Sequence, residues 1–205
     1  MKKLILAAAS ALLLAACQNT MPTYNMRRPP PGVPGSQSAP SAMPPASLPP
    51  LTGTAGPIKP GRVDRYMDGF ERNLRARLRG QPAIVIRRGD NLLLVLPDSI
   101  LFAGKAISSY GGSVLRTVAG VLNYYDNTLV QVNGYTDTLG NDVQNLTISH
   151  DRAKLVMQTL TEDGVAASRL EAHGFGATDL RIATGPDKAE PRNRRIQLHI
   201  LPRLE

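Results

Sequence analysis

The sequence predicts an α/β (α+β) sandwich, with a mixed sheet of βαβαβ type and helices on one face. Short runs rich in Ile, Val and Leu alternate with segments whose apolar residues recur at helical spacing. The connections between later strands are long enough to contain a helix, so right-handed crossovers are expected. The expected folded domain, residues 82–202, is large enough to enclose one hydrophobic core.

The first two strands are predicted to form a hairpin. The apolar runs 83–86 and 92–96 are separated by a short polar stretch that contains Gly89 and Asp90. Gly and Asp favour turns because they tolerate the backbone conformations that tight turns require. The two runs are therefore expected to pair.

The later elements follow from the same patterns. They are a helix over 112–125, a strand over 128–135, a helix over 141–163, a strand over 170–175, an irregular loop over 176–191 and a closing strand over 193–201. Gly164 is expected to end the second of these helices. In the closing strand Ile196, Leu198 and Ile200 alternate with polar residues, which predicts that one face meets the core.

Residues 1–16 are predicted to be a secretory signal peptide. Two lysines precede an apolar run that ends in small residues, which is the order found in such signals. The run is shorter than the roughly 20 residues that a membrane-spanning helix needs. Cys17 follows and is the only cysteine in the sequence, so the chain has no internal disulfide.

The placement of Cys17 resembles a bacterial lipoprotein signal. The resemblance implies that the thiol carries lipid, palmitate included, and becomes the N-terminus after cleavage. It also implies that Gln18 directs the protein to the outer membrane, with the folded domain in the periplasm. Each buried methylene contributes roughly 0.8 kcal/mol, so more than one acyl chain gives a stable anchor. A plain signal peptide with an incidental cysteine is the alternative.

Residues 17–60 are predicted to be a flexible tether that begins at the lipidated Cys17. They are dense in Pro, Gly, Ser and Ala and have almost no periodic apolar pattern. Such a stretch cannot bury enough surface to offset the entropy lost on ordering. A proline-rich ligand for a recognition domain is the alternative.

Residues 61–80 are predicted to contain a basic amphipathic helix. Apolar residues recur at helical spacing from Val63 to Leu78, and arginines occupy much of the opposite side. Gly80 and Pro82 are expected to end the helix. The pattern fits packing against the following domain, and it also fits a basic surface for a membrane or a protein partner.

Composition limits the classes of function. The formal charge is +8, or 8 − 2 = +6 once Lys2 and Lys3 leave with the signal. A basic excess favours anionic lipid headgroups or the acidic groups of a cell-wall polymer, whereas an exported protein without a nucleic-acid motif is not expected to bind nucleic acid. The three histidines are scattered and no nucleophile motif is present, so we expect no catalytic triad, metal site, cofactor or enzymatic activity.

The stretch 132–153 carries the main functional signal. Asp137 lies just past the strand 128–135, and Asn145 and Arg152 lie on the helix that follows. Seven residues are close to two helical turns, so these two side chains share a face that begins near the strand end. We expect a pocket mouth with opposite charges, and an internal salt bridge without a ligand is the alternative.

Four segments in order resemble the signature of the OmpA-like (OmpA C-terminal, Pal-type) peptidoglycan-binding domain. They read NGYTDTLG, NLTISHDRA, GVAASRLEAHGFGATDL and PRNRRIQL. The resemblance, over about residues 92–200, implies that the domain holds the diaminopimelate of peptidoglycan stem peptides without covalent chemistry. It implies that Asp137 accepts the ligand's ammonium group and that Arg152 grips a carboxylate through its planar guanidinium. Thr136 and Asn145 would orient the ligand, and Arg194 would add a second positive contact.

The family pattern also raises expectations about neighbouring positions. Gly134 is expected to allow a close backbone approach at the strand end. Where the family often has an acidic or polar pocket residue, Ala103, Gly104 and Lys105 follow Phe102 here, and a lysine near the ammonium group would repel it.

The whole chain is similar to outer-membrane lipoproteins of that family, which implies a link between outer membrane and cell wall. The alternative function is a scaffold in an envelope or secretion machine, with protein partners on helix 61–80. For Arg194 and Arg195, an ordinary solvated face is the alternative.

Overall fold

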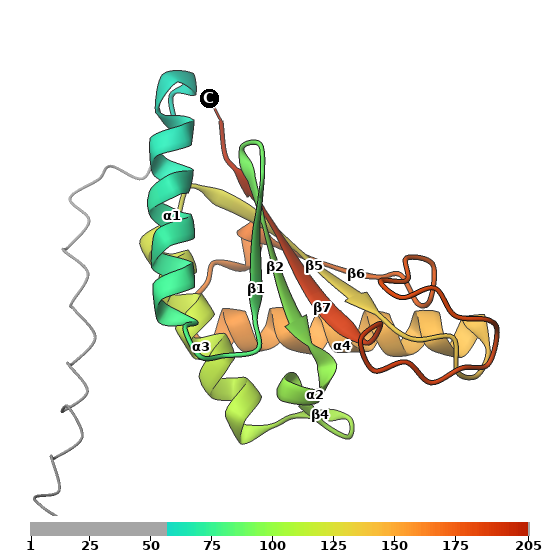
Figure 1. The fold of residues 1–205 in the computed structure, drawn as a ribbon. Coiled ribbons are helices and arrows are strands. Elements are labelled where there is room, and N and C mark those ends of the chain that lie inside the picture. Colours follow the sequence, from blue (N-terminus) through green and yellow to red (C-terminus); the bar gives the residue numbers. More distant parts are fainter. Residues whose placement is uncertain (1–56, 205) are drawn as a thin grey trace, which may run out of the picture. The chain divides into compact units, whose positions relative to one another are not determined.

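The computed structural model describes residues 57–204 of the chain. The signal peptide 1–16, Cys17 and most of the tether lie outside these residues. A five-stranded sheet has the order β1-β2-β7-β5-β6 (Figure 1). Its strands are β1 (Ile84–Arg88), β2 (Asn91–Pro97), β5 (Thr128–Tyr135), β6 (Leu170–Gly174) and β7 (Arg195–Pro202). Only β5 and β6 pair in parallel, so the sheet is mixed, as predicted.

The three long helices pack against one face of this sheet. They are α1 (Val63–Arg77), α3 (Ser109–Tyr124) and α4 (Asp142–Glu162), and 3-10 turns cover Pro60–Arg62 and Ala167–Arg169. The short α2 (Asp98–Leu101) precedes a small hairpin of β3 (Phe102–Ala103) and β4 (Ala106–Ile107). One cluster of buried apolar side chains joins α1, α3, α4 and the sheet. This arrangement confirms the predicted sandwich.

Turn and capping residues fix the element boundaries. In the predicted hairpin Arg88 pairs with Asn91, which leaves Gly89 and Asp90 as a two-residue turn with Gly89 at φ +57°. The helix expected from residue 112 begins earlier, because the Ser108 hydroxyl accepts a 2.8 Å bond from the Gly111 amide and caps the first turn.

The closing strand differs from expectation on its polar side. Arg195 is 2% exposed, so it does not belong to a solvated face. Its guanidinium stacks 3.9 Å over the Tyr135 ring and donates 2.9 Å bonds to the backbone and carboxylate of Asp179. Burial lowers the pKa of this arginine. The loop between β6 and β7 folds back over this strand, and the strand's alternation alone contains no sign of that cover.

Two glycines let α4 approach the sheet closely. Gly134 on β5 and Gly174 on β6 are register partners. A Cβ at Gly134 would lie 2.1 Å from the carbonyl oxygen of Ser149, and one at Gly174 would lie 2.4 Å from the amide of His150. The close approach expected at Gly134 is therefore present, and the approaching backbone is that of α4. This contact sets how near Arg152 comes to the end of β5.

We predict that Gly134→Ala lowers the free energy of unfolding by about 1–3 kcal/mol, because the added methyl group forces the α4 backbone away. Urea unfolding followed by circular dichroism measures the change. Gly120→Ala is the matched control, since Gly120 lies on α3 with open space around it and should gain stability from alanine. Equal midpoints for Gly134→Ala and wild type would contradict the packing argument.

Within residues 57–204, no helix is both long and apolar enough to cross a membrane.

Candidate ligand-binding site

A pocket of about 400 Å³ opens at the end of the sheet where β5 leads into α4. Its wall contains all five residues predicted to bind ligand, together with an acid that the sequence analysis did not select. The lining residues are Asp98, Phe102, Gly104, Thr136, Asp137, Leu139, Asn145, Ile148, Arg152 and Arg194. Asn145, Ile148 and Arg152 line it from one face of α4, as their spacing predicts.

Two separate ion pairs cross this pocket. Arg194 Nη1 lies 2.7 Å from Asp137 Oδ2, and Arg152 Nη1 lies 3.0 Å from Asp98 Oδ1. Asp137 and Arg152 are therefore not each other's partner, contrary to the alternative of an internal bridge between them. Each of the two acids is held beside a guanidinium, so the pocket wall alternates in charge.

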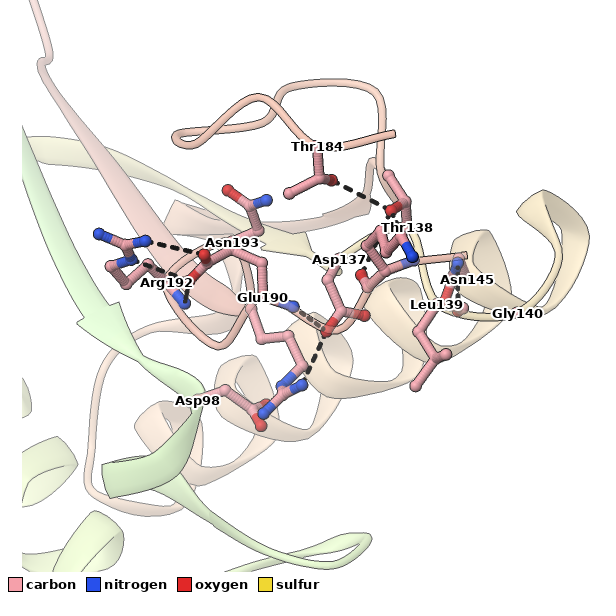
Figure 2. A network of polar contacts seen from close by, with 12 residues as sticks. Asp98, Asp137, Thr138, Leu139, Gly140, Asn145, Thr184, Glu190, Arg192 and Asn193 are labelled. Atoms are coloured by element: carbon pink, nitrogen blue, oxygen red, sulfur yellow. Dashed lines mark hydrogen bonds and ion pairs between the residues drawn. The ribbon is translucent and has the colours of Figure 1, made fainter. Parts of the chain in front are cut away.

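The Asp137 carboxylate is oriented through only one of its oxygens. Its Oδ2 accepts bonds from the Arg194 guanidinium and, at 3.1 Å, from the Glu190 amide (Figure 2). No residue of the described chain donates to Oδ1. The side chain is 6% exposed, so a donor that reaches Oδ1 meets a fixed and poorly hydrated charge.

Arg152 is held from two sides. Its guanidinium lies 5.3 Å from the centre of the Phe102 ring and is paired with Asp98 through Nη1. The side chain remains 22% exposed. A planar guanidinium presents several donors in a fixed plane, so one that is partly paired can still bind a carboxylate.

Thr136 and Asn145 play different parts in the wall. The Thr136 hydroxyl is buried and has no hydrogen-bond partner within residues 57–204. Buried polar groups are rarely left unpaired, so this hydroxyl is an unsatisfied group in the wall of the pocket. Asn145 already donates a 3.0 Å bond to the Leu139 carbonyl, which holds the turn that leads into α4.

The connection between β6 and β7 is hydrogen-bonded to Thr138 and Asp137 beside the pocket. The Thr138 hydroxyl donates a 2.7 Å bond to the Gly185 carbonyl and lies 3.1 Å from the Thr184 hydroxyl (Figure 2). Arg192 binds both oxygens of Glu190 at 2.8 Å, and these hydrogen bonds lower the pKa of Glu190 to about 2. The Glu190 amide that faces Asp137 is thereby fixed in place.

Asp98 is the site residue that sequence reasoning missed. It is the first residue after β2, and Asp137 is the second residue after β5. An acid just after an apolar strand was the available signal. Burial raises its pKa, an effect that Arg152 and Arg194 oppose and that Asp137 adds to. By contrast, Gly104 lines the pocket whereas the exposed Lys105 does not, so the expected repulsion from Lys105 finds no support.

We predict that the free energy of unfolding of wild type falls relative to that of Asp98→Asn as the pH rises. The fall should begin near 3.8, the ordinary pKa of an aspartate, and end above the raised pKa of Asp98. The folded protein holds this proton more tightly than the unfolded chain, so its contribution is present at low pH and is lost when the carboxyl ionises. Urea unfolding of both proteins across an acidic pH series measures the difference. A difference that does not change with pH would refute the assignment.

A larger hollow, about 530 Å³, lies along the other side of α4. Leu146, His150, His173 and Phe175 are among its lining residues, and its lining contains neither a carboxylate nor a guanidinium. Opposite charges therefore distinguish the smaller pocket from this hollow. In the part of the chain that the structure describes, no three His, Cys, Asp or Glu residues are grouped to hold a metal ion.

The protein is an α/β sandwich domain with a charged pocket at one end of its sheet. Residues 103–194 match the OmpA family, so the chain contains an OmpA family domain. The probable lipoprotein YiaD of Escherichia coli is 35% identical over 144 residues, which are 69% of this chain and 66% of the relative.

A second relative and a solved structure extend this comparison. The peptidoglycan-binding protein ArfA of Mycobacterium bovis is 31% identical over 85 residues, 42% of this chain and 26% of the relative. This chain thus spans about two thirds of the length of the first relative and about a quarter of the second. The fold matches a putative MotB-like protein from Desulfovibrio vulgaris with a TM-score of 0.60, at 18% identity over 70% of this chain and 96% of that chain.

Proposed function

We propose that the domain 82–202 binds the diaminopimelate of peptidoglycan stem peptides without covalent chemistry. Lipid on Cys17 and the tether 17–60 would hold it at the outer membrane and so link that membrane to the cell wall. The observation that carries the proposal is one pocket with an oriented acid, Asp137, and an oriented base, Arg152, that are not paired with each other.

The chemistry of the ligand matches this arrangement. The free end of diaminopimelate carries an ammonium group and a carboxylate on one carbon atom. Asp137 Oδ1 would accept from the ammonium group, and the remaining donors of Arg152 would bind the carboxylate. The buried Thr136 hydroxyl and Asn145 would orient the ligand, and Arg194 would add positive charge near the carboxylate.

The relatives support the same assignment. ArfA is named as a peptidoglycan-binding protein and YiaD as a probable lipoprotein. The pocket holds its charges in place and offers no nucleophile activated by a base, so we assign it binding rather than catalysis.

Co-sedimentation with purified peptidoglycan tests the ligand. A protein of residues 17–205 with Cys17→Ser keeps the whole core, whose members lie between Ile58 and Ile200. We expect it to pellet with diaminopimelate-type peptidoglycan and to stay in the supernatant with lysine-type peptidoglycan, because the side-chain end of lysine lacks the carboxylate. Equal pelleting with both types, or with neither, would overturn the proposal.

The anchor needs a separate test. Cells that express the full chain are grown with labelled palmitate, and we expect label in wild type but not in Cys17→Ser. Label in both proteins, or in neither, would show that Cys17 is not the lipid site.

A further inference from the structure

An arginine stripe lies on the outer face of α1, away from the peptidoglycan pocket. We use this name for Arg65, Arg72 and Arg79, which are all exposed and follow one another at intervals of seven residues. Seven residues make about two helical turns and rise about 10.5 Å, so the three lie in a row along the helix and the turn that follows it. The side chains of Met67 and Phe70 on the opposite side are fully buried in the core.

The stripe has no acidic partner within residues 57–204. Asp68 is three residues after Arg65 and four before Arg72, so it neighbours the stripe on the helix surface, but the acids of α1 pair with other arginines. Arg87 of β1 lies 3.7 Å from Asp64 and 3.4 Å from Asp68, and Arg75 lies 2.8 Å from Glu71. The three guanidinium groups of the stripe are therefore left without a direct ion pair in the described part of the chain.

The stripe belongs to the first helix after the proposed tether. The start of this helix is fixed to the sheet, because the Ile58 amide donates a 2.8 Å bond to the Arg203 carbonyl next to the end of β7. The proposed tether would enter the folded domain at this point. Linking two sites through such a tether raises their effective concentration for each other.

We propose that the arginine stripe docks on a bilayer surface that contains anionic phospholipids. Three positive side chains in a row can contact a plane of phosphate groups at the same time. Each arginine near such a surface strengthens binding about 5-fold. In Figure 1 α1 lies at the left of the view, and β5 ends at the right, where it leads into the pocket. The domain can thus face membrane and wall together. The proposal rests on the proposed function in one respect, because the lipid anchor is what would bring α1 close to the membrane. The test below does not need the anchor.

Vesicle co-sedimentation tests the docking surface. Residues 17–205 with Cys17→Ser are mixed with vesicles of phosphatidylethanolamine and phosphatidylglycerol, or of phosphatidylcholine alone. We expect binding only to the anionic vesicles, and weaker binding at higher salt because exposed charges are screened. The variant Arg65→Gln/Arg72→Gln/Arg79→Gln should bind about 100-fold more weakly.

A matched control separates this surface from net charge. Arg116→Gln/Lys154→Gln/Arg181→Gln removes three exposed charges outside α1 and should bind vesicles like the parent protein. The stripe variant should keep its binding to peptidoglycan, and Asp137→Asn should keep its binding to vesicles, so the two functions can fail separately. Equal losses in the stripe and control variants, no loss in the stripe variant, or a loss of peptidoglycan binding alone would overturn the proposal.

Discussion

Replacing Asp137 with asparagine is expected to lower the affinity for diaminopimelate-type peptidoglycan by about 100-fold. A hydrogen bond to a charged group contributes about 1.5–3 kcal/mol, and about 1.4 kcal/mol corresponds to a tenfold change in affinity. Asparagine has nearly the same shape, and its amide oxygen can still accept from the Glu190 amide. The change therefore removes the charge that the ligand's ammonium group needs while it preserves the loop. Co-sedimentation across a range of peptidoglycan concentrations measures the affinity.

The matched control for this change is Asp142→Asn. Asp142 is an exposed acid in the first turn of α4 and does not line the pocket, so its replacement makes the same change in net charge. It should bind peptidoglycan like wild type. Unfolding in urea shows whether Asp137→Asn remains folded. If folded Asp137→Asn pellets as well as Asp142→Asn, Asp137 does not contact the ligand.

Replacing Arg169 with methionine is expected to lower the free energy of unfolding by about 3–5 kcal/mol. This buried arginine donates bonds of 2.8–3.1 Å to the carbonyl oxygens of Thr128, Leu122 and Tyr125 and to the Thr128 hydroxyl. Its guanidinium thereby ties the C-terminal end of α3 to the start of β5. Each buried acceptor left without a donor costs about 1–3 kcal/mol, and several are lost together.

Urea unfolding measures this loss, and Arg116→Met provides the control. Arg116 forms an exposed ion pair with Asp163 at 3.4 Å, and pairs of this kind contribute about 0–1 kcal/mol. Because small domains have total stabilities of about 5–15 kcal/mol, Arg169→Met brings the protein close to unfolding. A midpoint within the range of Arg116→Met would contradict the structural role of Arg169.

The elements that the sequence predicted well are those whose local signals agree. The strand Thr128–Tyr135 has its predicted bounds, and α4 runs from the Asn141 cap to the Asp163 C-cap, just before Gly164. Both depend on periodicity and capping within a few residues. The start of α3 was missed because the cap at Ser108 lies before the apolar stripe begins.

The pocket residues that lie on one continuous segment of the chain were predictable from the sequence. Thr136, Asp137, Asn145 and Arg152 come from a single strand and helix, so their spacing placed them together. Asp98 and the burial of Arg195 depend on contacts between segments far apart in sequence. The Asp98–Arg152 pair requires β2 to end beside α4, and Arg195 is buried only because Asp179 of the long loop folds over it. Such contacts leave no local pattern.

Calorimetric titration with soluble stem peptides tests the central claim most directly. A tripeptide that ends in diaminopimelate is compared with one that ends in lysine and therefore lacks only the side-chain carboxylate. We expect a saturable heat with the diaminopimelate tripeptide, binding at least about tenfold weaker with the lysine tripeptide, and loss of binding in Asp137→Asn. Equal affinity for both tripeptides, or no heat from a protein that still pellets with peptidoglycan, would contradict the central claim.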